Sequence, residues 1–184
     1  LRLTIGNAYR ALGVYGAAEP HLRKALELKA QHLGNEHEDV IAAMISLANV
    51  YSDLGDYESA APLMNNALAI QQKVLGDQPL VFETMYNLAN VRERQADYSE
   101  AERLYRELLG RTPGKHDAEA AAQLPWALMG LAGTRYFQRD YREAAMLYER
   151  VVEELAGASD ARADDTAIAP LAARLVPLGR ELDA

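Results

Sequence analysis

The sequence contains no cysteine, so it has no disulfide, no thiolate metal site and no cysteine nucleophile. No hydrophobic stretch approaches the roughly 18 residues that a membrane-spanning helix needs. The formal net charge is −8 and no five like charges stand in a row, so the surface repels a phosphate backbone. We therefore expect a cytoplasmic protein with no nucleic-acid partner and no membrane partner.

Motifs that carry catalysis or bind metals are also scarce. The Gly-Val-Tyr-Gly segment at residues 13–16 lacks the lysine and the preceding strand of a phosphate-binding loop. His32 and His37 are five residues apart across a glycine turn, which does not place two imidazoles on one helical face. No serine in the repeats has a histidine at a fixed helical offset. We therefore expect no enzyme activity, no metal and no cofactor.

What the sequence does contain is a repeat of about 42 residues. Four tyrosines fall 42, 41 and 43 residues apart, and each is followed three residues later by an alanine. Because two columns keep the same unequal spacings, one structural unit must occur four times. The columns are Tyr15, Tyr57, Tyr98 and Tyr141, and Ala18, Ala60, Ala101 and Ala144.

The second copy indicates that each unit is a helical hairpin. Ile45, Ala48 and Tyr51 have the spacing of one helical face. Gly55 is suited to end this helix, and Asp56 is suited to cap the next one. One hairpin cannot bury both of its faces, so neighbouring hairpins must stack. The sequence therefore predicts an all-α solenoid of antiparallel helix hairpins.

Later copies repeat the turn with a pattern typical of a capping box. In this motif the first residue caps the helix, and a glutamate three residues later bonds back to the N–H of that cap. The patterns are Asp97-Tyr98-Ser99-Glu100 and Asp140-Tyr141-Arg142-Glu143.

These motifs resemble the tetratricopeptide-repeat (TPR) consensus, whose usual unit has about 34 residues. The longer unit here is similar to the kinesin-light-chain type of repeat. The resemblance implies a right-handed superhelix whose first helices line a concave groove that binds a peptide of a partner protein. The residues that carry it are Leu47-Ala48-x-x-Tyr51, Gly55-Asp56-Tyr57, Ala60 and Ala67, with the connections Leu33-Gly34-Asn35-Glu36-His37 and Leu75-Gly76-Asp77-Gln78-Pro79.

The repeat pattern divides the chain. We expect four TPR-type repeats in residues 1–156, at approximately 1–36, 37–77, 78–116 and 117–156. Residues 157–184 are expected to form a linker and a C-terminal capping helix or degenerate fifth-repeat helix. Whether residues 117–123 form a separate turn or extend the following helix stays open. Helix breaks are expected near Gly13, Gly34, Gly55, Gly76, Ala96, Gly110 and Arg139.

Candidate contact residues lie on the outward faces of the first helices. A column of asparagines there is suited to bind an extended peptide, because an amide both donates and accepts hydrogen bonds. The first helix of the fourth copy adds aromatic and methionine side chains, which are typical interface anchors. The peptide-binding candidates are Asn7, Asn49, Asn87, Asn90, Tyr86, Trp126, Met129 and Tyr136.

Alternatives remain both for the roles of these residues and for the function of the protein. The asparagines can instead bridge helices inside a repeat, and the C-terminal helix can cover Phe137. The function we expect is a protein–protein interaction module or scaffold, and a homo-oligomer is compatible with it. The alternative is a regulatory or oligomerisation segment of a larger multidomain enzyme, such as a bacterial protein kinase fused to TPRs.

Overall fold

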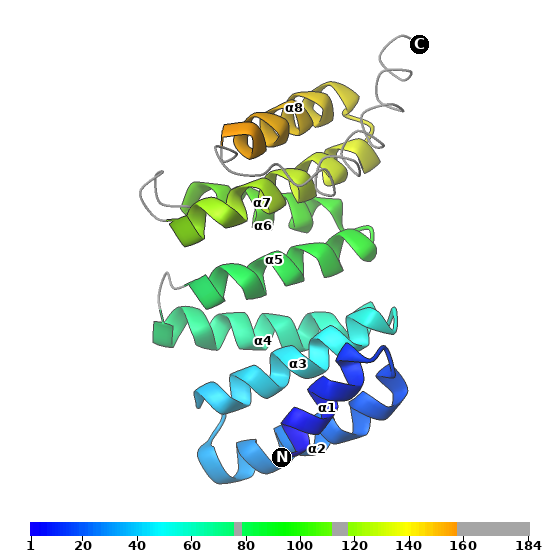
Figure 1. Ribbon diagram of the computed structural model, residues 1–184, viewed down its shortest axis with the longest axis vertical. Coiled ribbons are helices and arrows are strands. Elements are labelled where there is room, and N and C mark those ends of the chain that lie inside the picture. Colours follow the sequence, from blue (N-terminus) through cyan, green and yellow to red (C-terminus); the bar gives the residue numbers. More distant parts are fainter. Residues whose placement is uncertain (76–78, 112–117, 158–184) are drawn as a thin grey trace. The chain divides into compact units, whose positions relative to one another are not determined.

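The turn residues of the repeats coincide with the ends of the helices. The computed structural model describes residues 1–75, 79–111 and 118–157, and all regular structure within these ranges is helical (Figure 1). The all-α fold class is therefore confirmed. The tail predicted to form a linker and capping helix lies outside the described residues beyond Gly157. The helices are α1 (Arg2–Ala11), α2 (Tyr15–Leu33), α3 (Glu38–Asp53), α4 (Tyr57–Leu75), α5 (Pro79–Arg94), α6 (Tyr98–Arg111), α7 (Ala118–Phe137) and α8 (Tyr141–Gly157).

The chain forms two compact units, which are described separately. The first unit is Leu1–Ala96 and contains α1 to α5. Within it each helix packs on the next, and α3 also contacts both α1 and α5. The second unit begins at Asp97 and contains α6, α7 and α8, where α7 packs on both of the others. The first helices of the first three copies therefore lie next to one another in the first unit.

The turns inside the hairpins use the left-handed backbone region. Gly13 and Gly55 have φ values of 74° and 79°, which glycine adopts without a steric penalty. The equivalent residues of the later copies are Ala96 and Arg139, with φ values of 60° and 65°. The turn geometry is thus kept even where the glycine has been lost. Gly76 lies outside the described residues, and Gly110 lies in the last turn of α6.

The predicted capping box at residues 140–143 forms only in part. Asp140 caps α8, since its Oδ1 accepts from the Glu143 N–H at 3.2 Å. However, the Asp140 N–H already donates to the Arg135 carbonyl at 2.9 Å, which closes the end of α7. The Glu143 carboxylate is therefore left to bind arginines instead. Asp56 and Asp97 cap α4 and α6 in the same way as Asp140.

Helix α7 resolves the question left open for residues 117–123. A single helix runs from Ala118 to Phe137 and contains Pro125, so residues 118–123 extend the helix that follows them. Pro20 and Pro62 likewise lie inside α2 and α4.

The alanine column that follows the repeat tyrosines is fully buried, with an exposed fraction of 0% at each of Ala18, Ala60, Ala101 and Ala144.

Helix α4 contains a buried polar side chain. Gln71 in α4 has an exposed fraction of 0%, and neither atom of its amide has a hydrogen-bond partner among the described residues. The equivalent residue of the first copy is Lys29, which pairs with Asp39 at 3.0 Å, and this hydrogen bond lowers the pKa of Asp39. The position equivalent to Asp39 in the third copy is Leu80. Gln71 therefore lacks the partner that its position has in the neighbouring repeat.

We expect Gln71→Leu to raise the free energy of unfolding by about 1–2 kcal/mol. A buried unsatisfied amide costs about 1–3 kcal/mol, and leucine has a similar volume. Urea unfolding measures the change, with Gln72→Leu at the exposed neighbouring position as the matched control. A lower urea midpoint for Gln71→Leu would show that the amide is satisfied by a buried water molecule.

Candidate functional site

Helix α3 shows how one sequence produces a buried face and an open face. Leu47 and Tyr51 are buried, with exposed fractions of 3% and 7%. Ser46, Asn49 and Asp53 follow the spacing i, i+3 and i+7, which places them together on another side of the helix. We call the open sides of α1, α3 and α5 the first-helix face. It is defined by Asn7, Arg10, Ser46, Asn49, Asp53, Tyr86, Asn87 and Asn90.

A pocket of about 390 Å³ opens on this face between α1 and α3. Across it the Arg10 Nε donates to the Asp53 Oδ2 at 2.6 Å, and the two side chains are 40% and 29% exposed. The pocket therefore contains one positively and one negatively charged side chain, and their charges compensate each other. Its lining residues are Asn7, Arg10, Ala11, Tyr15, Ser46 and Asp53.

Three of the predicted asparagines have unused hydrogen-bonding capacity. In the part of the chain that the structure describes, the amides of Asn7, Asn49 and Asn87 form no side-chain hydrogen bond. Asn7 is exposed, and the other two are half-buried. An asparagine that bridges two helices would be bonded to the neighbouring helix. Tyr86 and Asn90 are also half-buried, on α5.

The candidates of the second unit have a different environment. Trp126 on α7 is 55% exposed. Met129 and Tyr136 instead pack against the buried cluster that joins α7 to α8. The Phe137 ring stacks on Tyr98 at 5.7 Å between centroids with an interplanar angle of 13°. Of the three candidates on α7, Trp126 is thus the one that projects furthest from the core.

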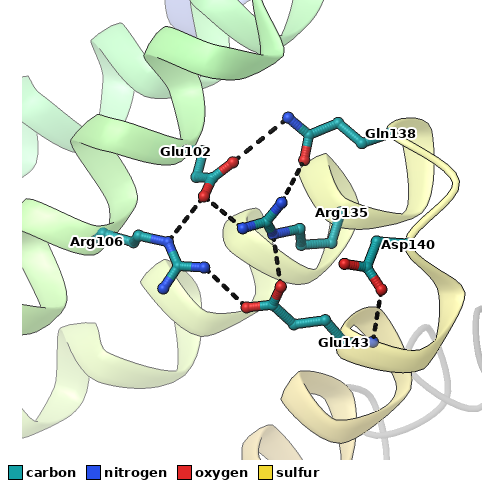
Figure 2. A network of polar contacts seen from close by, with 6 residues as sticks. All are labelled: Glu102, Arg106, Arg135, Gln138, Asp140 and Glu143. Carbon is teal, nitrogen blue, oxygen red and sulfur yellow. Dashed lines mark hydrogen bonds and ion pairs between the residues drawn. The ribbon is translucent and has the colours of Figure 1, made fainter.

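A closed ring of ion pairs ties the helices of the second unit together (Figure 2). Glu102 on α6 binds Arg106 at 2.9 Å and Arg135 at 2.5 Å. Glu143 on α8 binds the same two arginines, at 2.8 Å and 2.9 Å. The hydrogen bond to Glu102 raises the pKa of Arg106. All four charges are matched within the protein, which indicates a structural role for the ring.

In the first unit a tyrosine occupies the position equivalent to Arg135 and makes the corresponding contact between helices. Glu19 and Arg23 of α2 align with Glu102 and Arg106 and form the same ion pair four residues apart. The Tyr51 hydroxyl, at the position equivalent to Arg135, donates to Glu19 at 3.3 Å and accepts from Arg23 at 2.5 Å. Burial raises the pKa of Tyr51, so its hydroxyl stays protonated and available as a donor.

Comparison with known proteins identifies the repeat. A family model described as tetratricopeptide repeat matches residues 1–73 and 47–112. The chain is a tetratricopeptide-repeat protein. Tetratricopeptide repeats mediate protein–protein interactions, and no curated protein sequence matches this chain.

Solved structures agree on the type of repeat in this TPR protein. BtubC (BKLC) from P. vanneervenii has a TM-score of 0.80 at 19% identity, over 89% of this chain and 65% of the BtubC chain. The nearly identical TPR-like repeats of a putative kinesin light chain from Podosopora anserina have a TM-score of 0.72 at 20% identity, over 99% of this chain and 90% of theirs. A point variant of those repeats has a TM-score of 0.75. The helical-repeat solenoid class with kinesin-light-chain-like repeats is thus confirmed.

Sequence reasoning about this TPR protein missed the charged part of the pocket. Arg10 and Asp53 are 43 residues apart, and no spacing rule within one helix links them. Their position relative to the asparagine column could have indicated the pair. Asp53 lies one turn after Asn49, and Arg10 lies one turn after Asn7. Opposite charges that flank the same asparagine column on adjacent helices can meet across those helices.

Among the described residues, no group of three histidine, aspartate or glutamate side chains lies close enough to hold a metal ion. Within the same ranges, no helix is both long and apolar enough to span a bilayer.

Proposed function

We propose that this TPR protein binds an extended segment of a partner protein along its first-helix face, across α1, α3 and α5. The observation that carries the proposal is the set of unpaired amides at Asn7, Asn49 and Asn87, within the described residues, beside an open polar pocket. An extended backbone presents N–H and C=O groups in turn, and a carboxamide can pair with either.

The electrostatics of the face favour binding through neutral hydrogen bonds. Arg10 and Asp53 neutralise each other at 2.6 Å, so neither is left as an isolated charge to attract a charged peptide. The three amides are uncharged. We therefore expect affinity for a peptide to depend only weakly on ionic strength.

We expect the double variant Asn49→Ala, Asn87→Ala to bind such a peptide roughly 5- to 150-fold more weakly. Each lost hydrogen bond costs about 0.5–1.5 kcal/mol, and 1.4 kcal/mol corresponds to a factor of ten in affinity. The probe is a 12-residue peptide selected from a random display library on the wild-type chain. Isothermal titration of that peptide against each variant measures the loss.

Asn66→Ala on the exposed side of α4 is the matched control, and its affinity for the peptide should equal that of the wild type. The competing interpretation, in which the asparagines bridge helices, predicts a lower melting temperature with unchanged affinity. That result would remove the first-helix face from the proposal. It would also leave the regulatory or oligomerisation role as the better explanation of the repeats.

A further inference from the structure

The pocket between α1 and α3 offers more than a surface for a peptide backbone. It is a recess of about 390 Å³, which can admit a side chain while the backbone of the bound segment stays at the rim. Asn7 and Arg10 enter it from α1, and Ser46 and Asp53 enter it from α3. With Tyr15 of α2, five polar side chains from three helices thus line the place where one residue of the partner would lie.

The lining combines donors and acceptors at nearly zero net charge. The Arg10 Nε is used by Asp53, while the remaining guanidinium N–H groups of Arg10 have no partner among the described residues. The second oxygen of Asp53, the hydroxyl of Ser46 and the amide of Asn7 add acceptors and donors. A ligand that matches this set must itself both donate and accept.

We infer that this pocket binds a side-chain carboxamide, that of a glutamine or asparagine, from the partner segment; the inference rests on the proposed function. A carboxamide places two N–H donors and one carbonyl acceptor on one planar group. Its N–H groups can donate to the Asp53 carboxylate while its carbonyl accepts from Arg10 or Asn7. Hydrogen bonds to charged groups are stronger than those between neutral groups.

Other side chains fit the lining less well. A carboxylate would be attracted by Arg10 but repelled by Asp53. An ammonium group would be attracted by Asp53 but repelled by Arg10. An aliphatic side chain would leave the ion pair and the Asn7 amide without the water molecules that satisfy them, at a cost in free energy. A main-chain amide has the same chemistry as a carboxamide, but it offers one N–H rather than two and is held at the rim by its neighbours.

The test selects one random 12-residue peptide library against three proteins: the wild-type chain, Asn7→Leu and the matched control Asn66→Leu. We expect glutamine and asparagine together to be enriched about fivefold at one position of the peptides bound by the wild type and by Asn66→Leu. The enrichment should disappear with Asn7→Leu. Selected peptides carrying Gln→Glu, Gln→Lys and Gln→Gly at that position should each bind at least about tenfold more weakly.

A second variant tests the charge balance itself. Asp53→Asn removes the negative charge and leaves Arg10 without its partner, so the preferred residue should change from glutamine to glutamate. Because both side chains are partly exposed, the variant should remain folded, and its circular dichroism spectrum checks this.

The outcomes separate the inference from the proposed function. Peptides that bind the first-helix face without any carboxamide preference would overturn the inference and leave the proposed function standing. Equal binding of the Gln→Gly peptide would assign the contact to the main chain and likewise overturn the inference. If no peptide is enriched on the wild-type chain, both the proposed function and the inference fail.

Discussion

Replacing Gly130 by alanine is expected to lower the free energy of unfolding by about 3 kcal/mol, at the upper end of the cost of overpacking a core. A Cβ at this position would lie 2.4 Å from the Cε1 and Cζ atoms of the Tyr105 ring. Real Cβ atoms do not approach other atoms so closely. Tyr105 has an exposed fraction of 0%, so its ring has no space into which it can move. Helix α7 or the ring must shift instead.

Gly110→Ala is the control for the intrinsic preference of a helix for alanine. Among the described residues, no atom beyond the neighbouring backbone of its own helix lies within 4 Å of a Cβ built at Gly110, which is also helical. This variant should be neutral or gain up to about 1 kcal/mol, because glycine is the poorer helix former. Urea unfolding of both variants gives the comparison. Equal midpoints for Gly130→Ala and the wild type would show that α7 does not pack on Tyr105 as closely as the structure has it.

The second large effect is expected at the ring of ion pairs in Figure 2. Arg135→Met should lower the free energy of unfolding by about 2–3 kcal/mol, since removing one partner of a largely buried ion pair leaves the other uncompensated. Glu102 and Glu143 are only 20% and 28% exposed, and Arg135 is 19% exposed. In the variant these two carboxylates share the positive charge of Arg106 alone. Chemical unfolding at low and high salt measures the loss.

Arg135→Tyr distinguishes the ring from simple packing. Tyr51 stands at the equivalent position of the second copy, where its hydroxyl bonds to the Glu19–Arg23 pair. A tyrosine at position 135 can bond to Glu102 and Arg106 in the same way, so this variant should lose less stability than Arg135→Met. If both variants lose the same amount, the ion pairs contribute nothing beyond side-chain packing. If Arg135→Met is as stable as the wild type, the ring does not stabilise the unit at all.

The same repeats also show which parts of the candidate site follow from sequence. The asparagine column is visible as a spacing of 42 and 41 residues, and the helical period places Asn49 on a different side of α3 from buried Leu47. Whether the column is free or bonded could not be read from spacing. Only the packed structure shows that Asn7 and Asn49 have no hydrogen-bond partner in the described residues.

By itself the sequence determined the helices, their breaks and the buried alanine column, because these depend on local backbone preferences and on the period of a single helix. The tertiary structure decided everything that depends on how side chains of different helices meet. It paired Arg10 with Asp53 and left Gln71 buried without a partner among the described residues. Such contacts join residues that no local rule relates, so their geometry exists only once the helices have packed.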